Sequence, residues 1–494
     1  MSRPAAVARG WVAVAAALTL GACVGPSPEV QPAPVPAPHG TPIDPAMRAV
    51  LDSITTAVTA VAPEPAPVTL AIDTVGQLSW LGMLRDTEAI ALVRAALQHN
   101  RDYQAATARV AEYQAMYVGT RSAMLPELDV NGAVSANKSI FGSLVLPPYD
   151  LFNATASVSW EVDFWGRVRR TTQASRYDWS GRLADRRAIV LSLVSSVVTA
   201  YLQLRELDED VAISQQTLAS RRETYRLARE RFDQGLISEL DVRQFESEVA
   251  TSAVSLASFL RLRDAQENAL SVLIGQAPGP IGRGGPLDSA VNAVQVPDSV
   301  PSTLVLRRPD VMSAEADWSA ARARVGAAEA ARLPRFAITA SYGRQHPSLD
   351  GLFGSSSEIY TAQLGVSVPL FAGGRVSSSV EAAAAHADEA RLHYEQTVLN
   401  ALRETSDALD GIRLSRDQLT AQETQTRALR RALELAQRRY ASGVASYLDV
   451  LDVERGLFAA ELALAQARRQ YLAATVELYK AVGGSWDDLA AHGP

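Results

Sequence analysis

Two patterns of apolar and polar positions alternate along the chain beyond residue 70. Segments of about ten residues alternate apolar and polar side chains, which is typical of strands with one apolar and one polar face. Longer segments repeat apolar residues every seventh position, which predicts long packed helices. The expected strands lie at about 127–138, 153–164, 336–345 and 360–370, and one expected helix runs from Val168 to Phe232. At 1.5 Å per residue that helix would measure roughly 100 Å.

The whole pattern occurs twice. Asp310 repeats Asp102, and Pro334 repeats Pro126, in both cases 208 positions later. The stretch "RFDQGLISELDV" also precedes "RYASGVASYLDV" by 208 positions. Agreement of separate segments at one offset indicates internal duplication. Each unit is expected to form helix, strand, strand, long helix, turn and helix.

The beginning of the chain has a different composition. A basic start, a short apolar run and then Leu20-Gly21-Ala22-Cys23 are typical of an export signal. The last four residues resemble the lipobox of bacterial lipoproteins, in which Cys23 would be acylated; an ordinary signal peptide with an incidental cysteine is the alternative. Prolines then recur as in an extended tether. The expected divisions are a signal peptide at 1–22, a lipidated cysteine and tether at 23–68, a first repeat at 69–275, a linker at 276–304 and a second repeat at 305–488.

The strands favour a membrane barrel over a soluble sandwich. After the export signal, the sequence has no run of the roughly 18 continuous apolar residues that a membrane helix needs. Aromatic residues cluster near the strand ends, as in an interfacial girdle. Four strands cannot close a barrel, because closed barrels need at least about eight. Several chains must therefore contribute, and composition alone does not separate two chains with eight strands from three with twelve.

The alternation also predicts which side chains face a lumen. If the apolar positions contact lipid, Asp129, Glu161 and Asp163 lie on the opposite parity and face the lumen. Rings of acids favour cations. The sequence therefore predicts a cation-preferring pore.

Charge and motifs argue against other classes of protein. The net charge of −7 does not suit a nucleic-acid binder, which needs a basic face. No H-x-x-H or H-E-x-x-H spacing occurs, and Cys23 is the only cysteine. His386 and His393 are seven positions apart on an expected helix and could share a face. We expect no metal, no cofactor and no catalytic activity.

Several segments resemble a known family. "LRRPDV", "VPLFAGGR" and "RRYASGVASYLDVLDVER" are similar to segments of the TolC-like outer-membrane efflux proteins, in particular the lipid-anchored OprM-like (NodT-type) branch. The resemblance covers about residues 70–488. It implies a mainly α, internally duplicated fold with long coiled hairpins and four strands per chain, and a homotrimer that closes a 12-stranded barrel in the outer membrane of a Gram-negative bacterium.

The resemblance also implies a function. The chain would be the passive exit duct of a tripartite pump for small molecules such as drugs, with a periplasmic adaptor and an inner-membrane pump of the resistance-nodulation-division type as partners. Two alternatives stay open: the exit duct of a type I protein secretion system, and an envelope-bridging adaptor lipoprotein that forms no channel.

Two short turns join the long helices of each unit. They contain Gly235, Leu236 and Ser238 in the first unit, and Gly443, Val444 and Ser446 in the second. Glycine tolerates the left-handed conformation at a helix end, so plain helix capping explains these turns. By resemblance, the turns are also the tips that contact the adaptor.

A candidate gate follows the second turn. Leu448 and Asp452 are four positions apart and Arg455 is three further on, so all three project from one side of a helix. By resemblance, Leu448 is a ring-forming leucine and Asp452 a constricting aspartate. Arg455 could bind Asp452 within the chain or bind a neighbouring chain. The alternative is a leucine in the helix seam beside an ordinary surface ion pair.

Overall fold

The structure is a computed structural model that describes residues 86–138, 140–141, 144–145, 147–285 and 305–484. All of these lie in one compact unit, residues 70–494. The expected signal peptide, Cys23 and the tether lie outside the described residues, as do residues 286–304 of the expected linker.

The helices form two sets related by the offset of 208, which confirms the predicted duplication. Counterparts have equal lengths of 22, 67 and 35 residues. The first set is α4 (Arg101–Ser122), α5 (Arg167–Asp233) and α6 (Glu239–Leu273), and the second is α9 (Pro309–Ala330), α10 (Arg375–Ala441) and α11 (Tyr447–Ala481). A further helix, α3 (Thr87–His99), precedes α4.

The strands form a four-stranded antiparallel sheet in the order β1-β4-β5-β6, so β1 and β6 are its edges. All four strands overlap the ranges expected from the alternation, and β4 begins at Tyr149 rather than at about residue 153. The strands are β1 (Glu127–Asn137), β4 (Tyr149–Val162), β5 (Arg335–His346) and β6 (Glu358–Ser367). Two short strands, β2 (Ile140–Phe141) and β3 (Leu144–Val145), follow β1 in the sequence and pair with each other. A 3-10 helix, η2 (Asp350–Phe353), follows β5 in the sequence and precedes β6.

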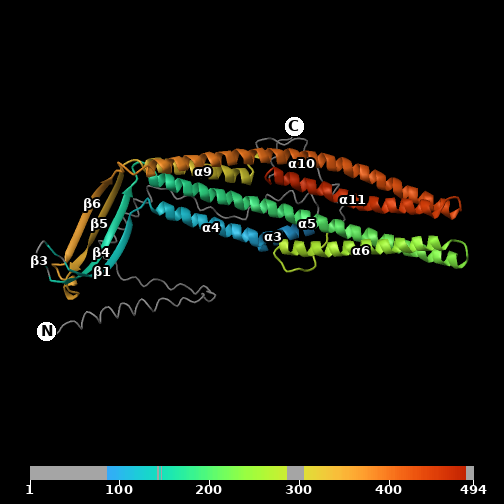
Figure 1. Cartoon of the computed structure of the whole chain (residues 1–494), viewed down its shortest axis with the longest axis horizontal. Coiled ribbons are helices and arrows are strands. Elements are labelled where there is room, and N and C mark those ends of the chain that lie inside the picture. The colour runs from blue at the N-terminus through green and yellow to red at the C-terminus, as the bar shows by residue number, and fades with distance from the viewer. Residues whose placement is uncertain (1–85, 139, 142–143, 146, 286–304, 485–494) are drawn as a thin grey trace. The chain divides into compact units, whose positions relative to one another are not determined.

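Each pair of long strands leads into a long helix (Figure 1). The residue before α5 is Gly166 with φ 80°, and the residue before α10 is Gly374 with φ 84°. Both angles lie in the left-handed region, which a residue with a Cβ adopts only with strain. The repeated glycine therefore allows the same turn from sheet to helix in both repeats.

The core lies around the middle of α5. This helix packs against α3, α4, α6, α9 and α11, whereas α10 packs against α9 and α11. Val197, Val198 and Leu204 of α5 and Leu472 of α11 are completely buried. Burial of one such aliphatic side chain contributes about 1.5–3 kcal/mol. The core thus fastens the second repeat onto the central helix of the first.

One window of 18 residues in α5 has a mean hydropathy of 1.5, which is high enough for a membrane span by composition. Within the described residues α5 is the single helix that passes this test. Half of the window is buried against the rest of the structure. Packing in the core accounts for its apolar character.

α10 differs from its counterpart α5 in how much of it is covered. Large apolar side chains of α10 remain exposed in the single chain: Leu392, Leu399, Leu402, Leu414 and Leu435. Part of the apolar surface of α10 thus remains uncovered by the other described elements.

Candidate functional site

The register of the sheet separates an apolar face from a polar face. Leu128 lies opposite Val158, and Val158 lies opposite Ala340. Because side chains alternate along a strand, each such row stays on one face. Val130 and Tyr360, on this apolar face, are each 81% exposed. The large exposed side chains of the apolar face are Leu128, Val130, Val134, Ile338, Tyr342, Tyr360, Leu364 and Val366.

The polar face carries Asp129 and Glu161 among hydroxyl and amide side chains. Glu161 accepts two hydrogen bonds of 2.8 Å from Nε and Nη2 of Arg167. Nε of Arg335 lies 3.4 Å from the same carboxylate. Asp129 is exposed and has no partner within the described residues. The two acids thus share a face, but arginines neutralise only Glu161.

Asp163 is not on a strand, so strand parity does not support its predicted place facing the lumen, which stays a prediction. β4 ends at Val162, and the carboxylate of Asp163 accepts hydrogen bonds from N of Val168 (3.1 Å) and N of Arg169 (2.8 Å). These are unpaired amides in the first turn of α5, where a carboxylate is favoured. The alternation of apolar and polar residues continues past the end of β4 only by coincidence. The aspartate that caps α5 occupies a position that would be polar if the strand went on.

The two tips are capped helix ends. Gly235 has φ 72° and Gly443 has φ 74°, and both close the turn after a long helix. Ser238 and Ser446 are the N-cap residues just before α6 and α11, and their backbone N–H groups donate to an aspartate three residues on (3.0 Å each). Capping therefore accounts for the glycines and serines. It does not account for Leu236 and Val444, which are 68% and 69% exposed.

In the predicted gate, Leu448 and Asp452 are both exposed. Leu448 is 56% exposed, so it does not fill the helix seam of its own hairpin. Arg455 does not bind Asp452, which corrects one of the two expected pairings. Instead, Arg455 binds the carboxylate of Glu248 on α6, with an Nε–Oε1 distance of 3.1 Å.

Glu248 is the centre of a buried charge cluster that the sequence analysis missed. It also binds Arg221 of α5 at 2.7 Å, and Arg221 donates to Ser252 at 2.9 Å. Glu248 and Arg221 are only 5% and 6% exposed. Nearby on α11, burial raises the pKa of Glu454, although Arg221 opposes this shift. The cluster ties α5, α6 and α11 together close to the predicted gate.

The sequences of the two repeats differ at the positions of this cluster, and that difference could have indicated it. The positions equivalent to Arg221 and Glu248 are Leu429 and Gly456. A seam position that is apolar in one repeat and charged in the other indicates a buried polar interaction, because isolated charges are not buried.

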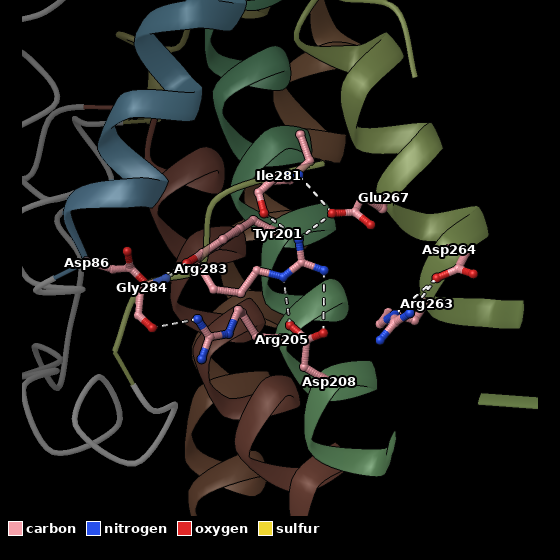
Figure 2. A network of polar contacts seen from close by, with 10 residues as sticks. All are labelled: Asp86, Tyr201, Arg205, Asp208, Arg263, Asp264, Glu267, Ile281, Arg283 and Gly284. Atoms are coloured by element: carbon pink, nitrogen blue, oxygen red, sulfur yellow. Dashed lines mark hydrogen bonds and ion pairs between the residues drawn. The ribbon is translucent and has the colours of Figure 1, made fainter. Parts of the chain in front are cut away.

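A second polar network fastens the segment after α6 to α5 (Figure 2). Nε of Arg283 donates to Asp208 at 3.0 Å, and its Nη1 binds Glu267. N of Gly284 donates to the hydroxyl of Tyr201 at 2.8 Å. Burial raises the pKa of Tyr201 to about 12. These contacts order the described start of the linker.

The described residues contain no group of three or more His, Cys, Asp or Glu side chains placed to hold a metal ion. His386 contacts Glu389 at 3.3 Å. His393, seven positions along the same helix, joins no such group within the described residues.

Comparisons with known proteins agree with this architecture. Residues 92–276 and 300–484 match the family model "Outer membrane efflux protein". The toluene efflux pump outer membrane protein TtgF of Pseudomonas putida is 31% identical over 422 residues, which cover 84% of this chain and 87% of the relative. The cation efflux system protein CusC of Escherichia coli is 28% identical over 417 residues, which cover 84% and 90%.

Solved structures give the same result. A crystal structure of CusC aligns with a TM-score of 0.76 at 28% identity, covering 81% of this chain and 92% of that one. The open-state MtrE outer membrane channel of Neisseria gonorrhoeae aligns with a TM-score of 0.75 at 30% identity, covering 81% and 90%. The duplicated helices, the two-faced sheet and these matches together show that the chain belongs to the outer membrane efflux protein family and is an outer-membrane efflux channel rather than an enzyme.

Proposed function

We propose that three copies of the chain form the exit duct of a tripartite pump and passively conduct small molecules from the periplasm to the outside. The observation that carries this proposal is the sheet, which exposes an apolar face and leaves two edge strands unpaired. Open edges are not tolerated in hydrocarbon. Three copies would give twelve strands, with the apolar face toward lipid and the polar face toward a lumen wide enough for cargo.

The exposed stripe on α10 supports the same assembly. Within the chain, α5 is covered on one side by α4 and α6 and on another by α9 and α11. The main packing partners of α10 among the described elements are α9 and α11, with one hydrogen bond of 2.9 Å from Arg231 of α5 to the hydroxyl of Tyr440. By repeat equivalence, α4 and α6 of the next copy would cover the remaining side of α10.

The proposed partners follow from the names of the relatives. TtgF is named as a protein of an efflux pump and CusC as a protein of an efflux system. We assign an adaptor to the tips, where Leu236 and Val444 offer exposed apolar contacts. An inner-membrane pump of the resistance-nodulation-division type would drive transport. Acylation of Cys23, which lies outside the described residues, would add a lipid anchor.

The gate that we propose consists of Leu448 and Asp452, repeated around the three-fold axis. Arg455 would hold this part of α11 against α6 through Glu248. An ion pair with one exposed partner contributes only about 0–1 kcal/mol, a suitable strength for a contact that an adaptor must release.

The names of the relatives include toluene, antibiotics and cations. We propose drugs and other small amphiphiles. A deletion strain should become more susceptible to such compounds. Unchanged susceptibility together with loss of a secreted protein would indicate a type I secretion duct instead.

Reconstitution in planar bilayers tests the channel and its gate. The purified protein should have the mass of a trimer, and Leu448→Ala with Asp452→Ala should raise single-channel conductance. The matched control is Leu240→Ala with Gln244→Ala, the equivalent positions of the first hairpin. Equal effects of the two double variants would contradict the assignment of the gate to α11.

A further inference from the structure

The two junctions between sheet and long helix are repeats with different chemistry. Each has a left-handed glycine followed by an arginine at the first position of the helix: Gly166 and Arg167 before α5, Gly374 and Arg375 before α10. The glycine before the helix is thus left-handed in both junctions. The second junction also has a left-handed Gly373 (φ 55°), and β6 ends at Ser367, three positions before the equivalent of the β4 end. The side chains around the two arginines differ as well.

The first junction contains its own carboxylates. Glu161 binds Arg167 through two hydrogen bonds of 2.8 Å. Asp163 accepts hydrogen bonds from the N-terminal amides of α5. Both the guanidinium group and the helix N-terminus are therefore neutralised within the chain.

The second junction lacks both carboxylates. Pro369 and Phe371 occupy the positions equivalent to Glu161 and Asp163. The side chain of Arg375 is exposed and makes no hydrogen bond or ion pair within the described residues. It lines a cavity of about 310 Å³ whose walls include Pro369 and also Glu161, Asp163 and Arg167 of the first junction. The first junction shows what an arginine at this position binds, and the second leaves that position open.

The two edge strands identify the source of the missing carboxylate. Within the chain, β4 pairs with β5 so that Glu161 lies opposite Ala337. The repeat equivalents of β4 and β5 are β6 and β1, the two unpaired edges. Moving Glu161 forward by 208 positions gives Pro369, and moving Ala337 back by 208 gives Asp129. The same register between two copies would place Pro369 opposite Asp129, with Glu127 two residues away.

The side chains along both edges agree with this register. It would place Leu364 opposite Val134 and Val368 opposite Val130 on the apolar face. On the polar face it would place Gln363 opposite Ser135 and Ser367 opposite Asn131. A slip by one residue would instead move apolar side chains to the polar face.

We propose that β6 pairs with β1 of the partner subunit in this register, and that Arg375 binds the partner's Asp129 and the partner's Glu127. Within one chain, the carboxylate that binds the junction arginine is on β4. Between chains, the carboxylate that binds it would be on β1 of the partner subunit. Asp129 and Glu127 are exposed and have no partner within the described residues, so they are available for this contact. The inference rests on the trimer proposed above and specifies its contacts.

Charge exchange tests the ion pair. Arg375→Glu should lower the temperature at which detergent-solubilised trimers dissociate, and addition of Asp129→Arg should restore most of that loss. Arg332→Glu, an exposed arginine one turn before β5, is the matched control and should cause little change. Arg375→Gln should also increase cation preference in bilayers, because it frees two carboxylates per subunit on the polar face. Failure of the exchanged pair to restore assembly would overturn the ion pair.

Disulfide formation tests the register. Directly opposite residues have Cα atoms about 4.5–5.5 Å apart, within the range that a disulfide spans. In a Cys23→Ala background, which has no other cysteine, Leu364→Cys with Val134→Cys should give covalently linked trimers. Leu364→Cys with Gly132→Cys, a slip by two residues on the same face, should give few.

Different results would refute the trimer and the register between β6 and β1. A wild-type protein that stays monomeric under all conditions would refute the proposed trimer. Trimers that conduct ions but cross-link through Gly132 instead of Val134 would overturn the register while leaving the proposed function intact.

Discussion

The buried carboxylate of Glu248 offers the sharpest test of what holds the second hairpin against the first. Glu248→Gln keeps the shape of the side chain and removes its charge. Arg221, 6% exposed and bound to Glu248 at 2.7 Å, would then lose the carboxylate that it contacts directly. Arg455→Gln removes only the ion pair between Arg455 and Glu248, in which the arginine side chain is 60% exposed.

The expected magnitudes differ because burial differs. Removal of one partner from a buried ion pair costs about 3–5 kcal/mol. Glutamine still accepts a hydrogen bond, so we expect about 3 kcal/mol for Glu248→Gln. The partly exposed pair of Arg455 contributes about 0–1 kcal/mol. Since each 1.4 kcal/mol corresponds to tenfold, local opening should become about 100-fold more frequent in the first variant and at most about fivefold in the second.

Hydrogen exchange of the α6 and α11 amides, followed by mass spectrometry, measures this local opening. Replacing both Arg221 and Glu248 by leucine should restore slow exchange, because apolar residues of similar volume replace buried ion pairs at little cost. The counterpart of Arg221 in the second repeat is already Leu429. Similar acceleration by Glu248→Gln and Arg455→Gln would refute the argument from burial.

Three further predictions concern other parts of the chain. Burial raises the pKa of Asp210 to about 7. The folded protein therefore keeps a proton that the unfolded chain releases near the ordinary pKa of about 4. The stability of the folded protein consequently falls as the pH rises from about 4 to about 7. Asp210→Asn should flatten this dependence in melting curves taken from pH 5 to pH 8, and an unchanged slope would contradict the assignment. Cys23→Ala should abolish metabolic labelling with palmitate, and persistent labelling would exclude acylation at this cysteine. Arg283→Ala should expose residues 276–285 to limited proteolysis, because it removes contacts to α5 and α6; Arg263→Ala, which loses only a contact to its neighbour in sequence, should not.

The longest helix of the first repeat was predictable to within a residue at each end. The expected helix from Val168 to Phe232 corresponds to Arg167–Asp233. Seam residues recur every seventh position throughout, and glycines mark the helix boundaries in both repeats. Such a signal is strong because it is sampled many times along one element.

Single polar side chains were less predictable, because their roles depend on distant partners. Asp163 continues the parity of a strand and yet caps a helix. Glu248 belongs to a helix with many surface charges, and only packing against α5 and α11 buries it. Arg455 found its partner 207 positions away, a separation at which local spacing gives no information.

The equal lengths of α5 and α10, and of α6 and α11, restrict how this protein can change length. An insertion in one long helix alone would shift its tip away from the other and break the register with its hairpin mate. A tolerated insertion must therefore occur in all four helices together, in steps of seven residues that preserve the seam. Each step would extend the helical part by about 10 Å. The distance that the chain reaches beyond its sheet is thus a quantity that evolution can alter only in discrete, coordinated increments.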